Sequence, residues 1–201
     1  MRYALLTVFL WLTAVSPAVA AELARFFTHV HTMAADFHQV VRNRHGTVVS
    51  RGNGRMWLAR PGRFRWNYDH PYHEQIIGQG RTVWLYEPGL AQATRYSLDR
   101  ALGRTPALLL AGEGNIGRLF HARPMGQRHH LQWVRLTPRG RGQGFRWIEV
   151  GYNGVHVRRL NLADDMDQIT DIRFTHIRIN RALASSLFEF VPPPHTAIVR
   201  P

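Results

Sequence analysis

The 201-residue chain contains no cysteine and no lysine, because all 26 of its basic residues are arginine. Without cysteine it cannot form disulfides, thiolate metal sites or a cysteine nucleophile, and it has no thiol to carry a lipid at its N-terminus. Without lysine it lacks the group used in Schiff-base catalysis and in the phosphate-binding P-loop. These two absences exclude several classes of enzyme before any motif is considered.

Acidic residues are also scarce, at 13, so the formal net charge is +13. A charge of this size and sign is typical of proteins that bind nucleic acid. The arginines are spread along the whole chain, however, and no single element gathers them. We therefore expect no nucleic-acid partner, and attraction to anionic lipid headgroups is another use of the same charge.

The N-terminal segment has the pattern of a secretory signal peptide. Arg2 precedes an apolar run over residues 4–15, and residues 18–20, Ala-Val-Ala, form a cleavage site. The apolar run is too short to cross about 30 Å of hydrocarbon. We expect residues 1–20 to be removed and residues 21–201 to form one exported domain, away from most DNA and RNA.

Hydrophobic periodicity predicts one helix followed by a long series of strands. Apolar residues at 23, 26, 27, 30 and 33 lie on one stripe of a helix over 22–33. A Thr-Pro pair at 105–106 opens a short apolar helix that ends at Gly112, and a second short helix is expected over 115–120. The expected strands are 35–43, 46–59, 63–68, 73–79, 81–86, 90–96, 130–137, 144–151, 154–163, 167–179 and a last one that includes 188–191.

The resulting fold class is mainly β with a few helices, an antiparallel sheet that bends into an open barrel. In one predicted strand, Phe64, Trp66 and Tyr68 alternate with polar residues, so the three aromatic side chains share a sheet face. The predicted helices are too short to cover the concave side of such a sheet densely. This imbalance favours an apolar cavity lined by aromatic and aliphatic side chains.

Motifs for catalysis or metal binding are lacking. The one acidic cluster, at residues 164–167, lies between two predicted strands and reads as a polar turn. The 12 histidines are scattered, and the pairs at 70/73 and 129/130 have no third ligand at a recognisable spacing. Known nucleophile, zinc-protease and nucleotide-binding patterns do not occur. We expect neither an enzyme nor a bound metal or cofactor.

Residues 54–68 carry a specific pattern, Gly-x-Met-Trp-Leu-x-Arg-Pro-Gly-x-Phe-Arg-Trp-x-Tyr. The pattern resembles the signature of the periplasmic outer-membrane lipoprotein carrier family, LolA. The similarity continues in order through 75–77, 80–88, 90–93, 105–111, 136–139, 165–170 and 188–193. It departs after Pro193, where the family usually continues with glycine and this chain has Pro-His-Thr.

The resemblance implies an unclosed antiparallel β half-barrel with a helical lid over an apolar cavity. The cavity would hold the acyl chains of lipoproteins that an inner-membrane ATP-driven transporter releases, and the carrier would deliver them to an outer-membrane acceptor. That acceptor is itself a lipoprotein and needs an N-terminal cysteine, which this chain lacks. The resemblance therefore points to the soluble periplasmic carrier, expected to act as a monomer.

The resemblance also implies roles for particular residues. Arg60 would latch the lid through hydrogen bonds when the cavity is empty, whereas the residues alone suggest only a solvated arginine beside a turn. The expected acyl-chain cavity comprises Phe64, Trp66, Trp84, Leu108, Leu109 and Leu110, the three leucines lying on a lid helix. The expected second lid helix carries Leu23, Phe26, Phe27 and Val30.

Two alternatives keep this fold but change the function. One is a periplasmic regulator that senses lipids or lipoproteins, similar to the anti-sigma-factor-binding proteins that share the half-barrel. Those proteins usually carry a second domain, for which this chain has no residues left. The other is a carrier of a different lipid or an enzyme of a specialised pathway, which the identity of a co-purified ligand would reveal.

Overall fold

The computed structural model describes residues 18–97, 106–112, 116–140 and 144–200. Its helical elements are α1 (Ala18–His29), η1 (Pro88–Leu90), α3 (Pro106–Ala111), α4 (Ile116–Leu119) and η2 (Ser185–Phe188), of which η1 and η2 are 3₁₀ helices. Its strands are β1 (Thr32–Arg42), β2 (Val48–Ala59), β3 (Arg63–His70), β4 (Glu74–Gln79), β5 (Thr82–Glu87), β6 (Gln92–Ser97), β7 (Phe120–Arg128), β8 (Leu131–Pro138), β9 (Phe145–Asn153), β10 (His156–Asp164), β11 (Ile169–Ile179) and β12 (Ala197–Val199).

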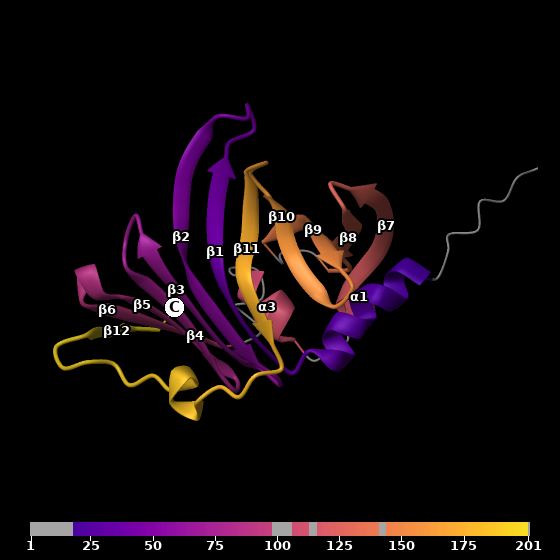
Figure 1. Ribbon diagram of the computed structural model, residues 1–201. Helices are drawn as coiled ribbons and strands as arrows, with labels where there is room; N and C mark the ends of the chain where they lie inside the picture. The colour runs from indigo at the N-terminus through magenta and orange to yellow at the C-terminus, as the bar shows by residue number, and fades with distance from the viewer. Residues whose placement is uncertain (1–17, 98–105, 113–115, 141–143, 201) are drawn as a thin grey trace, which may run out of the picture.

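These strands form one 12-stranded sheet in the order β12-β6-β5-β4-β3-β2-β1-β11-β10-β9-β8-β7. Each strand pairs antiparallel with its neighbour except β12, which runs parallel to β6. The pairing of β1 with β11 joins the two halves of the sheet (Figure 1). The sheet curls strongly and its edge strands β7 and β12 do not pair with each other, so the predicted unclosed half-barrel is confirmed.

The inner face of the sheet holds the apolar core. Phe64 of β3 lies opposite Leu58 of β2, and Trp66 lies opposite Met56. All four are at most 1% exposed. Strand alternation places their sequence neighbours on the outer face. The aromatic residues that alternate along β3 therefore lie on the inner face of the sheet.

Strand β7 is an element that the sequence patterns did not predict. Its residues include Pro124 and Gly126, which are typical of turns. The pairing of β7 with β8 shifts register between these two residues, and Gly126 adopts a positive φ of 75°. Proline is tolerated here because β7 is an edge strand with a bulge.

The prediction of a strand over 188–191 is wrong. Residues 185–188 form η2, and the chain regains strand structure only in β12. Phe190 packs against Trp84 and Tyr86, at ring-centroid distances of 5.5 and 5.2 Å. Phe190 is therefore apolar because it packs on the surface of the sheet. Its segment is not a strand paired with the sheet by hydrogen bonds.

The first helix ends earlier than its apolar stripe. The stripe runs to Met33, but α1 ends at His29 and Met33 already belongs to β1. Asn180 caps the junction: its Nδ2 donates to the His29 carbonyl oxygen, and its Oδ1 accepts from the His31 amide, both at 2.8 Å. Local periodicity cannot reveal this end, because the capping residue lies 151 positions away.

Candidate functional site

Arg60 lies where the inner sheet meets the C-terminal ends of two helices. It directly follows β2, and its amide donates to the His31 carbonyl oxygen at 2.8 Å, which ties it to the segment between α1 and β1. Helix α1 contacts β7 and β8, whereas α3 contacts β2 and β3. We call α1 and α3 together the lid, and Arg60 stands between its two parts.

The Arg60 guanidinium donates hydrogen bonds to the ends of both lid helices. On the α3 side, Nη2 donates to the Leu110 carbonyl oxygen at 2.7 Å and Nε donates to that of Gly112 at 3.2 Å. On the α1 side, Nη1 donates to the carbonyl oxygens of Phe26, at 3.1 Å, and of Val30. The last carbonyls of a helix lack intrahelical partners and carry partial negative charge, so one cation stabilises both helix ends.

Two aromatic rings of α1 also contact this guanidinium. Its central carbon lies 4.6 Å from the ring centre of Phe26 and 4.9 Å from that of Phe27. Burial lowers the pKa of Arg60 to about 10, so the side chain remains charged at neutral pH. A partly buried cation surrounded by carbonyls and rings loses its partners if either helix moves.

The lid residues expected from the sequence face the core where the structure describes their side chains. On α1 and just after it, Leu23, Phe26, Phe27 and Val30 are at most 8% exposed. On α3, Leu110 is buried and Leu109 packs against the core while staying partly exposed. The side chain of Leu108 lies outside the described residues. The helices thus present an apolar underside to the sheet.

Beneath the lid, Trp66 joins a cluster of aromatic rings, and Phe64 belongs to the same apolar core. Trp66 lies 4.7 Å from Phe37 and 5.9 Å from Phe174 between ring centroids. Tyr68 contacts Phe37 at 4.9 Å and donates from its hydroxyl to Gln39 Oε1 at 3.0 Å. Here the space under the lid is occupied by the protein's own side chains, so this is a closed arrangement.

Trp84 does not join this cluster, and its assignment to the cavity is wrong. In the sheet Trp84 lies opposite Ile77, and its neighbour Val83 lies opposite Gly78, which faces Phe64. Alternation therefore places Trp84 on the outer face, where Phe190 covers it. The segment Val-Trp-Leu-Tyr at 83–86 is apolar on both faces, so the sequence alone could not say which face each residue takes.

Sequence reasoning also missed Asn180, which holds the end of the lid helix α1. Its left-handed backbone, with φ 53°, turns the chain directly after β11. Asparagine is one of the few residues that adopt this conformation readily. An asparagine at the end of a predicted strand was the available signal, but its partner could not be read from the sequence.

Among the described residues, no three histidine, aspartate or glutamate side chains are grouped in a way that could hold a metal ion. The helices in the described ranges also fall short of the length and apolar character that crossing a bilayer requires.

The fold and site define a class of protein, a curled half-barrel whose apolar interior is closed by two helices that one arginine holds. Residues 28–191 match the family described as "Outer membrane lipoprotein carrier protein LolA". The chain belongs to this family.

Individual relatives agree with the family match. An "Outer-membrane lipoprotein carrier protein" of Nitrosomonas europaea is 35% identical over 187 residues, covering 92% of this chain and 91% of its own. One of Methylobacillus flagellatus is 37% identical over 178 residues, covering 89% and 87%. The crystal structure of a LolA superfamily protein from Nitrosomonas europaea superposes with a TM-score of 0.53 at 10% identity, covering 89% of this chain and 99% of that chain, which supports the fold.

Proposed function

We propose that this protein carries lipoproteins across the periplasm by sheltering their acyl chains under the lid. The observation that supports this most strongly is Arg60, whose guanidinium holds both lid helices closed over an aromatic interior in a chain of the LolA family. The names of its relatives agree with the role. The expected signal peptide at residues 1–20 agrees with a periplasmic location.

The need for a container follows from the cargo. Each methylene group of an acyl chain is worth about 0.8 kcal/mol when it leaves water, so a lipoprotein with several chains cannot diffuse freely between membranes. A carrier must bind these chains and also release them. An interior that its own side chains fill when empty, as those of Phe37 and Trp66 do, makes release favourable because the core closes again.

The Arg60 latch would set the balance between binding and releasing the acyl chains. Hydrogen bonds to a charged group contribute about 1.5–3 kcal/mol each, and their loss on opening must be offset by burial of acyl chains. In this scheme the carrier receives its cargo from an ATP-driven transporter in the inner membrane and passes it to an acceptor in the outer membrane. In this scheme the protein acts as a monomer and needs no cofactor.

The proposal is tested by adding the mature protein to spheroplasts that have labelled lipoproteins in their inner membrane. We expect labelled lipoprotein to appear in the supernatant in a complex with the carrier. A lipoprotein whose acylated cysteine is replaced provides the control, because its release would not depend on an acyl-binding interior. If no acylated lipoprotein is released above the level with buffer alone, the proposal is wrong.

A further inference from the structure

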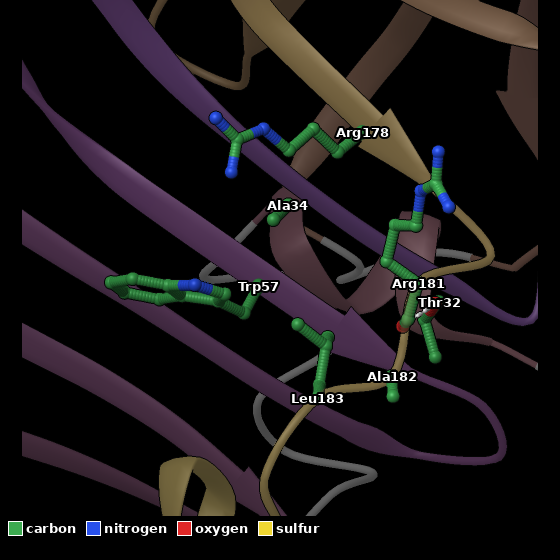
Figure 2. Close-up of a pocket in the computed structure, with 7 residues that line it drawn as sticks. All are labelled: Thr32, Ala34, Trp57, Arg178, Arg181, Ala182 and Leu183. Carbon is green, nitrogen blue, oxygen red and sulfur yellow. Dashed lines mark hydrogen bonds between the residues drawn. The ribbon is translucent and has the colours of Figure 1, made fainter.

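A groove of about 490 Å³ lies on the outer face of the sheet, opposite the face that the lid covers (Figure 2). Its lining residues come from β1, β2 and β11 and from the segment after β11: Thr32, Ala34, Trp57, Arg178, Arg181, Ala182 and Leu183. Figure 2 shows Trp57 and Leu183 on one side of the groove, with Arg178 and Arg181 across from them. The groove thus combines apolar side chains with two arginines, whose guanidinium groups point away from each other in this view.

The register of the strands fixes this groove on the outer face. Trp57 of β2 and Arg178 of β11 both lie opposite Ala34 of β1. The neighbours of Trp57, Met56 and Leu58, are buried in the core on the inner face. Trp57 therefore faces outward, where it remains partly exposed.

The segment 181–183 that lines the groove is fixed to the sheet by hydrogen bonds. Thr32 Oγ1 donates to the Arg181 carbonyl oxygen at 2.7 Å, and the Asn180 amide donates to the Thr32 carbonyl oxygen at 2.9 Å. The backbone on this side of the groove is therefore held in place before a ligand binds.

The two guanidinium groups of the groove are not neutralised by the nearby carboxylate. Asp36 already accepts hydrogen bonds from Arg55 at 3.0 Å and pairs with His176 at 2.9 Å. No ion pair between Arg178 or Arg181 and an acidic side chain occurs within the described ranges. Both arginines are exposed, so they remain available to an anion.

The mixture of groups points to an anionic amphiphile. Guanidinium groups bind phosphate oxygens in a bidentate manner, and tryptophan is favoured at the level of lipid headgroups, where one part of the ring is apolar and another is wet. We propose that this groove binds the phosphate headgroups of anionic phospholipids in a bilayer surface, with Arg178 and Arg181 each contacting a phosphate and Trp57 beside them.

A second pocket on the same strand favours a bilayer over a single small anion. This pocket, of about 600 Å³, is lined by arginines and histidines that include Arg158, Arg173 and His176, together with neutral side chains. Arg173 and His176 belong to β11, which also carries Arg178 of the groove. A bilayer presents many phosphates at once and so matches arginines that are spaced along one strand.

The groove also lies at the end of the sheet where the lid is held. Thr32 in its floor pairs with Ala59, the residue before Arg60. A membrane bound in the groove would therefore meet the carrier close to the helix ends that must open. The proposal goes beyond lipoprotein carriage and stands without it, because headgroup binding is measured with no lipoprotein present.

The test is flotation of the mature protein with vesicles at physiological salt. One set contains equal amounts of phosphatidylglycerol and phosphatidylcholine, and the other contains phosphatidylcholine alone. We compare the wild type with the double variant Arg178→Gln/Arg181→Gln and with a control, Arg81→Gln/Arg123→Gln, that removes the same charge from exposed sites elsewhere. Surface changes of this kind leave folding nearly unaffected, and circular dichroism of each variant checks this.

We expect the wild type to prefer phosphatidylglycerol vesicles, the groove variant to bind them about 30-fold more weakly, and the control to change less than about threefold. An equal loss in both double variants would show attraction by net charge alone and overturn the site. Absence of any preference in the wild type would overturn it as well. Displacement from the vesicles by millimolar glycerol 3-phosphate would assign the groove to a free phosphate and overturn the bilayer proposal, whereas its failure to compete supports it.

Discussion

Arg60 and Phe26 are joined by two contacts of different kinds. Nη1 of Arg60 donates to the Phe26 carbonyl oxygen at 3.1 Å, and the guanidinium carbon lies 4.6 Å from the centre of the Phe26 ring. The hydrogen bond holds the backbone of α1, and the cation–π contact orients a ring that points into the core. Both contacts are lost together if α1 lifts away from the sheet.

The first prediction concerns this latch. In Arg60→Leu the empty, closed state loses its hydrogen bonds to both helix ends, so release of cargo becomes less favourable. We expect the variant to accept lipoproteins from spheroplasts but to deliver them to outer-membrane vesicles about tenfold less completely, because loss of one charge-assisted bond corresponds to at least that factor.

The matched control for the latch is Arg81→Leu, which removes an exposed arginine from the turn between β4 and β5. Its delivery should equal that of the wild type. Normal delivery by Arg60→Leu would contradict the latch role of Arg60.

The second prediction separates the two faces of the sheet. Trp84→Ala loses the ring contact with Phe190 on the outer face. We expect it to lower the free energy of unfolding by about 2 kcal/mol and to leave lipoprotein release from spheroplasts unchanged. Urea unfolding and the release assay measure these two quantities. A stable Trp84→Ala protein that fails to release lipoproteins would place Trp84 in the cargo site after all.

The sequence predicted the fold well where the period of apolar residues was strong. The strands around Phe64 and Trp66 and the short helix that begins at Pro106 are present at nearly the expected positions. Strand β7 was missed because Pro124 and Gly126 mimic a turn, whereas the structure uses them in a bulged edge strand. The role of Phe190 was misread because alternation looks the same for a strand and for a segment packed on a sheet.

The candidate site was predictable only in part. The residues alone gave no reason to prefer Arg60 over the other 25 arginines, and the family resemblance supplied that choice. Its partners are main-chain oxygens of Leu110 and Gly112, which no side-chain pattern encodes. The cap by Asn180 could not be predicted from the sequence either, because it joins segments about 150 positions apart.

The third prediction tests the packing beneath the lid. Phe64 lies directly over Gly78 of the neighbouring strand, and a Cβ added at Gly78 would overlap the Phe64 ring. Gly78→Ala should therefore displace the ring and lower the free energy of unfolding by about 2 kcal/mol in a urea titration. Gly89→Ala is the control, since no atom lies within 4 Å of its added Cβ. Equal stability of the two variants would contradict the close packing of Phe64.

The fourth prediction concerns a buried carboxylate on the far half of the sheet. Glu149 is 4% exposed and accepts hydrogen bonds from Arg135 at 2.7 Å and from Arg128 at 3.0 Å. Burial alone would raise the pKa of Glu149, but the hydrogen bonds and charges of the two arginines outweigh it and hold the pKa below its usual value. Its ionised form therefore stabilises the folded state above the unfolded-state pKa, and this contribution is lost as pH falls through the folded-state pKa.

We accordingly expect Glu149→Gln to be about 2 kcal/mol less stable than the wild type at neutral pH, because both arginines lose their counter-charge. The difference should shrink as the pH falls below about 4. Urea unfolding over a pH series measures it, with exposed Glu189→Gln as the control. A difference that stays constant down to acid pH would show that the charge of Glu149 is not responsible.

The central claim, that the interior under the lid takes acyl chains, is tested most directly by native mass spectrometry with one lipopeptide in two forms. The mature protein is mixed with a tri-acylated lipopeptide or with the same peptide lacking its acyl chains. The account predicts a one-to-one complex with the acylated form and none with the bare peptide. Equal binding of both forms, or binding of neither, would contradict it.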